Sequence, residues 1–276
     1  MVADNTLSRK NFWIMVVNST AAFIISYLFI FYLNHFSIIF SAGMFEHSIS
    51  FDFSRIVYHV APSEWTPDSV KVIFGTGPLL VFITGLLAFL AYSSMSEDAE
   101  KVKILLLWIS LNALNFVFSG IIIGIIFKIR IAHLFLWMYF NDSQLLMMAM
   151  LGFFGILITS LIMAKRIVFS ANSYFNKLDE NNYPFFILAQ MIVPFIIGTV
   201  LVLIFFLPQI QITETYIWIG LAMVIIISSI LISKMDAVYF DEDIKETTFS
   251  WPLISIAVFL FFALRIVFNN EILMNW

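Results

Sequence analysis

The sequence predicts an all-α polytopic membrane protein: a bundle of about seven transmembrane helices with an outer cap segment. Apolar residues make up 62% of the 276-residue chain and charged residues only 12%, against about 45–50% and 25% in soluble domains. Seven apolar runs reach or approach the length of about 20 residues that crosses a bilayer. Most charges fall between these runs. Together these observations exclude a water-soluble fold.

The first run covers residues 12–33 and follows Arg9 and Lys10. It is longer than the apolar part of a signal peptide, so we interpret it as a retained anchor. The other six runs are expected at residues 74–95, 104–127, 144–164, 185–207, 216–233 and 252–268. The last run is at the lower length limit, and the bundle has six spans if it only dips into the membrane.

Residues 1–276 are expected to form a single transmembrane domain that includes a cap at residues 34–73. A connection of this length usually has structure of its own. It leads into Gly75-Thr76-Gly77-Pro78, where proline suits the first turn of the second helix. Residues 131–140 form a shorter apolar run, expected to be an interfacial or re-entrant helix with Trp137 and Tyr139 at headgroup depth.

Orientation follows from Lys and Arg, which are retained on the cytoplasmic side. With a cytoplasmic N-terminus, nine basic residues lie inside and four outside, and Arg265 lies near the outer end of the last run. The inner residues are Arg9, Lys10, Lys101, Lys103, Lys165, Arg166, Lys177, Lys234 and Lys245, and the outer ones are Arg55, Lys71, Lys128 and Arg130. We expect a multi-pass protein of a bacterial inner membrane, because the abundance of Phe, Ile and Asn is typical of an AT-rich bacterial genome.

Composition also limits the function. The net charge is −4 and the basic residues are scattered, so no nucleic acid partner is expected. The chain has no cysteine, which excludes thiolate chemistry and iron–sulfur clusters. No phosphate-binding loop or hydrolase motif is present. No Asp or Glu lies inside a predicted span, which argues against an ion-coupled carrier.

A polar stripe marks the third span. Its members, Trp108, Asn112, Asn115 and Ser119, lie on one helical face. Gln190 is a further polar residue inside a span. Such side chains either bond neighbouring helices together or line a pocket for a substrate or a lipid headgroup.

Gly120 and Gly124 form a GxxxG pair on an adjacent face of the third span, a pattern that permits close helix packing.

All four histidines, His35, His47, His59 and His133, fall on the outer side of this topology, among several carboxylates. Imidazole and carboxylate together suit zinc or another divalent metal, and histidine clusters also sense pH. No two of these histidines show the spacing of a metal motif. The alternative is that they are ordinary residues of polar loops.

Part of the chain resembles the site-2-protease-like membrane metalloproteases. The first span ends in Leu33-Asn34-His35-Phe36, a long loop follows, and the next span opens on Gly77-Pro78-Leu79-Leu80. That family places His-Glu-x-x-His in the first helix and an Asp in the third. Here His35 has neither the Glu nor the second His, and the third span reads Asn112-Ala113-Leu114-Asn115. The resemblance, over about the first 125 residues, therefore implies an inactive scaffold.

The resulting hypothesis is a protein that is not an enzyme and needs no cofactor: an accessory or structural subunit of a larger membrane complex. Its partners would be the lipid bilayer and other membrane subunits. One alternative is a transporter or lipid-handling protein with a polar pocket around Asn112, Asn115 and Gln190. Another is an extracytoplasmic metal or pH sensor.

Overall fold

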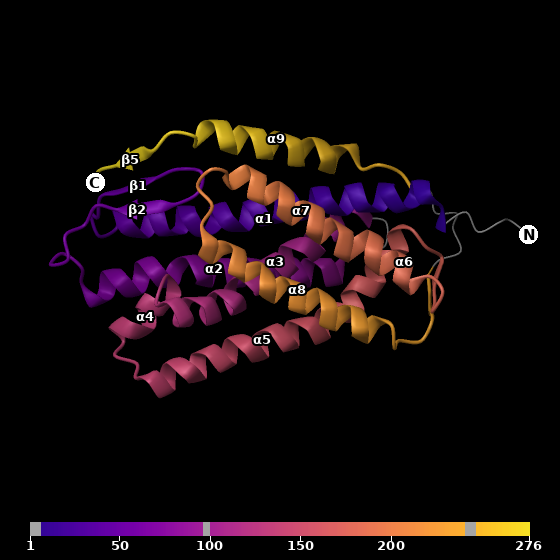
Figure 1. The fold of residues 1–276 in the computed structure, drawn as a ribbon, viewed down its shortest axis with the longest axis horizontal. Helices are drawn as coiled ribbons and strands as arrows, with labels where there is room; N and C mark the ends of the chain where they lie inside the picture. Colours follow the sequence, from indigo (N-terminus) through magenta and orange to yellow (C-terminus); the bar gives the residue numbers. More distant parts are fainter. Residues whose placement is uncertain (1–6, 96–99, 241–246) are drawn as a thin grey trace, which may run out of the picture.

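The computed structural model describes residues 7–95, 100–240 and 247–276. Figure 1 shows an elongated bundle whose long helices run roughly along its long axis. One end, here called the cap end, holds a short helix and a small sheet: β1 (Ile49–Phe51), β2 (Ile56–Tyr58), α4 (Ile131–Trp137) and β5 (Ile272–Met274). The N-terminus lies at the opposite end, here called the N-terminal end.

The architecture confirms an all-α polytopic membrane protein. In the described part of the chain, six helical segments are long and apolar enough to cross a bilayer. They are α1 (Arg9–Gly43), α2 (Pro67–Ser94), α3 (Glu100–Phe127), α5 (Asp142–Phe169), the continuous segment of α6 (Tyr183–Ile187), a π-helical turn (Leu188–Ile192) and α7 (Val193–Phe206), and α8 (Ile212–Ile232).

The seventh predicted span is α9 (Trp251–Val267), a helix of 17 residues. It packs along α1, as Figure 1 shows. At its start the Ser250 N–H donates to Asn18 Oδ1 (2.7 Å). After its end, the Phe53 N–H donates to the Phe268 carbonyl (2.9 Å). α9 is at the lower length limit for a spanning helix. It nevertheless extends from the level of Asn18, in the N-terminal part of α1, to the cap.

α1 is the central helix of the bundle. Its apolar window is 89% buried, against 28% for α2. Helices α2, α3, α7 and α9 all pack against it. Glycine lets a neighbouring helix approach closely. A Cβ on Gly198 of α7 would collide with the Phe23 ring of α1, so the absence of a side chain at Gly198 makes room for this ring. The first apolar run is therefore the core of the protein and not a peripheral anchor.

The predicted cap boundaries, residues 34–73, are wrong at both ends. α1 continues without a break to Gly43, because its polar side chains bond the preceding helical turn: Ser37 Oγ donates to the Leu33 carbonyl (2.6 Å). α2 already begins at Pro67, where Thr66 and Ser69 form a capping box. Pro78 consequently lies inside α2 and not in its first turn.

The connection between α1 and α2 holds the small antiparallel sheet. β1 is its central strand, with Ile49 opposite Tyr58 of β2 and Met274 of β5. The C-terminal segment thus completes the cap. Beyond β5, the Trp276 ring lies where a Cβ on Gly43 would be, so the absence of a side chain at the last residue of α1 makes room for it.

The short helix predicted at residues 131–140 is present as α4, Ile131–Trp137. Lys177–Leu178 (β3) and Val238–Tyr239 (β4) form a two-stranded ladder away from the cap sheet. Ser170–Ser173 form a short 3-10 helix after α5.

Candidate functional site

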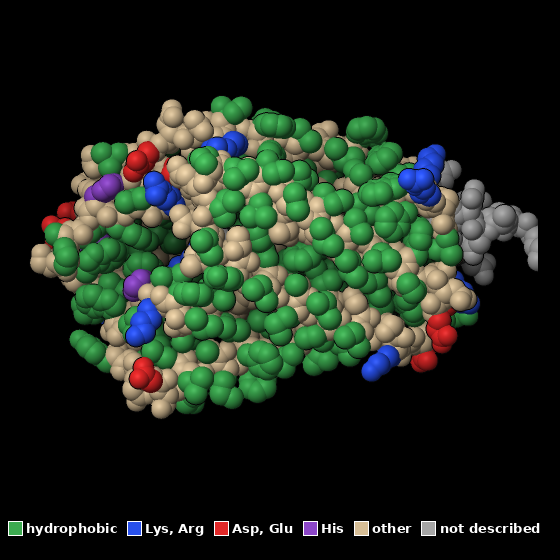
Figure 2. Space-filling model, viewed as in Figure 1, with side chains coloured by type: hydrophobic (Ala, Val, Ile, Leu, Met, Phe, Trp, Pro, Cys, Tyr) green, Lys and Arg blue, Asp and Glu red, His purple; other side chains and the backbone are tan. Residues whose placement is uncertain are grey.

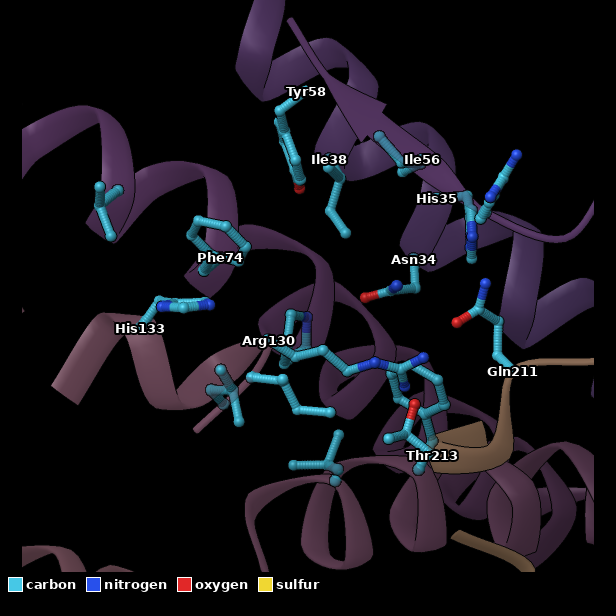
Figure 3. A pocket seen from close by; sticks show the side chains of 18 of the residues that line it. Asn34, His35, Ile38, Ile56, Tyr58, Phe74, Arg130, His133, Gln211 and Thr213 are labelled. Atoms are coloured by element: carbon cyan, nitrogen blue, oxygen red, sulfur yellow. The ribbon is translucent and has the colours of Figure 1, made fainter. Parts of the chain in front are cut away.

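A cavity of about 720 Å³ lies at the cap end. Its walls come from α1, the cap, α2, α3, α4 and the segment leading into α8 (Figure 3). This volume is within the range of small-molecule sites, about 300–1,000 Å³. α3 contributes Gly120 and α1 contributes Asn34, which lie about 10 Å and 14 Å below the cap-side ends of their helices at 1.5 Å per residue. The cavity therefore extends from the cap into the helical bundle.

One side of the cavity is polar. Figure 3 shows Asn34, His35, Gln211 and Thr213 on this side, with the Arg130 side chain extended toward them. Asn34 and His35 are buried on α1, and the His35 Nδ1 lies 2.9 Å from the Phe31 carbonyl. Among the described residues that line the cavity, none is Asp or Glu.

Arg130 is the central charge of this site. Burial lowers the pKa of Arg130 to about 10, and the hydroxyls of Tyr27 and Tyr58 partly oppose this shift. The guanidinium therefore remains protonated at neutral pH. A second guanidinium at the wall, that of Arg55, lies 3.5 Å from the Asp52 carboxylate and is half exposed. Because Arg55 is paired with Asp52, Arg130 is the charge that the cavity wall offers to a ligand, and a positive charge favours anions.

The backbone of Arg130 has a conformation that is unfavourable for a residue with a side chain. Its φ is 54° and its ψ −122°. A side chain at such angles costs on the order of 1–3 kcal/mol and persists where the surrounding structure imposes it, frequently at functional sites. Here the strained residue joins α3 to α4 and points its guanidinium into the cavity.

This strain predicts an unusual order of stabilities. Arg130→Gly and Arg130→Ala both remove the guanidinium, but only glycine adopts a positive φ freely. We expect the glycine variant to be the more stable of the two by up to about 1 kcal/mol. At Lys103, inside α3, the same pair should show the ordinary order, with glycine less stable by about 1 kcal/mol. Denaturant unfolding in detergent measures both; an alanine variant more stable than the glycine variant at residue 130 would refute the strain.

The opposite side of the cavity is aromatic. The Trp65 ring lies 5.5 Å from Tyr58 and 6.0 Å from Phe74, and Phe74 lies 4.8 Å from His133. Burial raises the pKa of Tyr58 and lowers the pKa of His133. Both shifts favour the neutral form, so this wall adds no charge at neutral pH. The cavity thus combines a cationic side with an apolar one.

The predicted polar stripe lies elsewhere. Trp108, Asn112, Asn115, Ser119 and Gln190 are all buried, and none lines the cavity. The stripe bonds α3 to other helices: Asn112 Nδ2 donates to Ser26 Oγ on α1 (2.6 Å), and Asn115 Nδ2 donates to the Ile217 carbonyl on α8 (3.0 Å). Ser119 Oγ donates to Asn115 Oδ1 (2.6 Å). This geometry fits the helix-bonding alternative, and the cavity described above lies away from the pocket expected at these residues.

A relay of hydrogen bonds connects three helices near Gln190. Pro194 has no N–H, so it cannot donate to the carbonyl of Gln190 four residues earlier, and a π-helical turn precedes it. Ser19 Oγ on α1 donates to this carbonyl (2.6 Å). Trp108 Nε1 on α3 in turn donates to Ser19 Oγ (2.8 Å). The Gln190 side-chain amide itself is buried and has no hydrogen-bond partner among the residues that the structure describes.

The predicted histidine site does not assemble. In residues 7–95, 100–240 and 247–276, no three His, Asp or Glu side chains lie close enough to hold a metal ion. His35 and His133 line the cavity, whereas His47 packs on Trp65 (5.0 Å). His59 Nε2 lies 2.7 Å from Ser50 Oγ. The histidines are separated because α1, the cap and α4 place them at different positions.

The two glycines of the GxxxG pair have different surroundings. A Cβ on Gly124 would lie 3.0 Å from the Ile129 carbonyl, so this glycine lets the segment before α4 pack closely. A Cβ on Gly120 would meet no atom of the described residues within 4 Å other than its chain neighbours and its own helical backbone, and Gly120 lines the cavity. The prediction that Gly120 packs against a helix is therefore corrected.

The residues quoted for the metalloprotease resemblance lie next to each other in space. A Cβ on Gly77 of α2 would collide with the Asn34 amide of α1. Pro78 and His35 both line the cavity. This contact brings the two segments together, and His35 is the only imidazole or carboxylate side chain among the residues quoted from them.

Sequence reasoning missed Arg130, Asn34, Gln211 and Thr213 as site residues. One signal was present: Arg130 directly precedes the apolar run recognised as an interfacial helix, whose Trp137 lines the cavity. Asn34, Gln211 and Thr213 have no comparable signal, because polar residues near helix ends are common.

Comparison of the chain with protein-family models, with curated proteins and with solved structures finds no match. The function must therefore be inferred from the site itself.

Proposed function

We propose that this protein is a non-catalytic, multi-pass membrane protein that binds an anionic ligand in the cap-end cavity. It would act in transport or in lipid handling, with the site at Arg130 in place of the predicted pocket at Asn112, Asn115 and Gln190. The observation that supports this is a cavity of about 720 Å³ with the partly buried guanidinium of Arg130 and, among its described lining residues, no carboxylate.

Electrostatics supports an anion over a cation or a neutral solute. A guanidinium offers five N–H donors in a planar fork that matches carboxylate and phosphate oxygens. Asn34, Gln211 and Thr213 lie within the same polar side and add side-chain donors. A cation in this cavity would meet the positive charge of Arg130, whereas the second cationic side chain at the wall, Arg55, is paired with Asp52.

The accessory-subunit hypothesis, first on sequence grounds, has no specific observation in its favour. Large exposed apolar side chains lie along α2, α5 and α9, among them Leu87, Leu151 and Phe259. Surfaces of this kind suit contact with lipid tails as well as contact with another membrane protein. We therefore place ligand binding first.

We further propose a bacterial inner membrane, with the N-terminal end in the cytoplasm and the cap end outside. Of the basic residues expected inside, all but Lys245 are among the described residues, and Lys245 lies outside them. Arg265, near the cap end, donates to the Leu207 carbonyl (2.8 Å), and its guanidinium carbon lies 3.5 Å from the centre of the Phe53 ring. An arginine directed toward the cap in this way fits a membrane boundary at that level.

The orientation predicts a labelling pattern. The chain has no cysteine, so single cysteines report their side of the membrane directly. Cysteine at the exposed Glu64 of the cap should react with an impermeant maleimide in intact cells. Cysteine at the exposed Asn181, between β3 and α6, should react only after the cells are lysed. The reverse pattern would overturn the orientation.

Anion binding can be measured on the purified protein in an uncharged detergent, with dodecyl phosphate as the probe and dodecanol as its neutral analogue. Dodecyl phosphate should bind more tightly than dodecanol. Arg130→Gln should weaken dodecyl phosphate binding about tenfold or more, since a hydrogen bond to a charged group contributes about 1.5–3 kcal/mol. Lys71→Gln is the matched control: Lys71 is a cap-end cation on α2, does not line the cavity and lies 3.6 Å from Asp68.

Equal dodecyl phosphate affinity in the wild type and in Arg130→Gln would refute the proposed function. An equal loss of dodecyl phosphate affinity in Lys71→Gln would also refute it, because the loss would then reflect the general surface charge and not the cavity.

A further inference from the structure

The shape of the cavity restricts the kind of anion. We propose that its ligand is an anionic amphiphile of the cap-side leaflet, whose phosphate or carboxylate head binds at Arg130 and whose hydrocarbon part lies on the aromatic wall and leaves sideways toward the bilayer. This inference rests on the proposed anion site and adds the chemical class of its ligand.

The first argument is the division of the cavity into two sides. In Figure 3 the Arg130 side chain extends toward Asn34, Gln211 and Thr213, while Phe74 and His133 lie on the opposite side. An inorganic anion would occupy the polar side alone and leave the aromatic wall in contact with water. A ligand with both an anionic and an apolar part covers both sides, and the burial of its apolar area away from water strengthens binding.

The second argument is the direction in which the cavity opens. Figure 2 views the bundle from the side and shows a hollow with green, hydrophobic walls near the cap end. In the same view the long helices run roughly along the long axis (Figure 1), which is the direction in which spanning helices cross a bilayer. The hollow on this face is therefore open sideways, at the level where lipid headgroups meet the ends of the helices.

The third argument is the apolar border of the site. Ile212 lies between Gln211 and Thr213, which both line the cavity, and it is 65% exposed. At the end of α3 the Phe127 ring stacks on Tyr216 of α8, with ring centroids 5.4 Å apart and an angle of 2° between the ring planes. Exposed apolar side chains next to a cationic cavity provide a surface for a hydrocarbon chain that extends out of it.

Gly120 provides a way to test the apolar part without disturbing the packing. In the described part of the chain, no atom outside its own helical turn lies within 4 Å of the position of a Cβ on this residue, which is part of the cavity wall. A larger side chain there enters the cavity space and not a helix interface. Gly120→Leu should therefore fill part of the cavity while the protein retains its fold, which a thermal melt would verify.

The experiment compares methyl phosphate, which has the charge without the chain, with dodecyl phosphate, which has both. Binding is measured by isothermal titration calorimetry on the full-length protein in an uncharged detergent. We expect dodecyl phosphate to bind wild type at least tenfold more tightly than methyl phosphate. Gly120→Leu should weaken dodecyl phosphate binding at least tenfold, and Arg130→Gln should weaken binding of both probes.

The outcomes separate the two proposals. If methyl phosphate binds as tightly as dodecyl phosphate and both depend on Arg130, the site takes a free anion; the amphiphile inference fails and the proposed function stands. If dodecyl phosphate binds with equal affinity to wild type and Gly120→Leu, its chain lies outside the cavity and the inference also fails. If neither probe depends on Arg130, both proposals fail.

Discussion

Ser19→Ala should lower the free energy of unfolding by about 2 kcal/mol, which is large for the removal of one hydroxyl group. Ser19 Oγ accepts from Trp108 Nε1 (2.8 Å) and donates to the Gln190 carbonyl (2.6 Å). Alanine would leave both groups without their partner in a part of the bundle where Ser19 and Trp108 are fully buried. The cost is high because Pro194 has already removed the helical donor for that carbonyl.

Ser229→Ala is the matched control. Ser229 Oγ donates to the Ile225 carbonyl within its own helix, α8 (2.6 Å), a bond that connects no second helix. Its removal should change the unfolding free energy by less than about 0.5 kcal/mol. Reversible unfolding in mixed detergent micelles, followed by helical circular dichroism, compares the two. Equal stability of the two variants would show that the relay between α1, α3 and the π-helical turn does not stabilise the fold.

Gly152→Ala should destabilise the packing of α3 on α5 by about 1–3 kcal/mol. A Cβ on Gly152 would lie 2.7 Å from the Phe118 carbonyl oxygen and 2.9 Å from Ile122. The first of these atoms belongs to the backbone of α3, so it cannot rotate away. The two helices would have to separate, and dispersion contacts along their interface would be lost.

The control here is Gly75→Ala in α2. A Cβ on Gly75 would meet Leu134 at 3.8 Å, an ordinary van der Waals distance. Alanine is the better helix former, so this variant should be as stable as wild type or more stable by up to about 1 kcal/mol. The same unfolding measurement compares Gly152→Ala with Gly75→Ala. Wild-type stability of Gly152→Ala would mean that α3 and α5 do not approach as closely as the structure shows.

The predicted spans and the observed helices agree well in position and less well at their ends. The run predicted at 104–127 is α3, Glu100–Phe127, and the run predicted at 144–164 is α5, Asp142–Phe169. The end of α1 was placed about ten residues too early, because Asn34, His35 and Ser37 resemble the polar start of a loop. In the fold these residues are buried, and His35 and Ser37 bond to carbonyls of their own helix.

The polar stripe of α3 shows a second limit of prediction from sequence: the spacing of polar residues does not tell what lies opposite them. Its spacing correctly indicated that Asn112 and Asn115 share a face turned toward protein. Whether that face meets a cavity or another helix depends on what lies opposite. Here Ser26 of α1 and the Ile217 carbonyl of α8 lie opposite and accept the amide hydrogen bonds.

The sequence by itself determined that this is a helical membrane protein and where its apolar helices lie, because the length and polarity of a run are local properties of the chain. Only the tertiary structure decided where the site is, because Asn34, Arg130 and Gln211 come from three distant segments that meet at one cavity. In a bilayer, the surface of a helix that contacts lipid is as apolar as the surface that contacts protein. The hydrophobic pattern therefore specifies which segments cross the membrane and leaves their mutual contacts to close packing and buried hydrogen bonds.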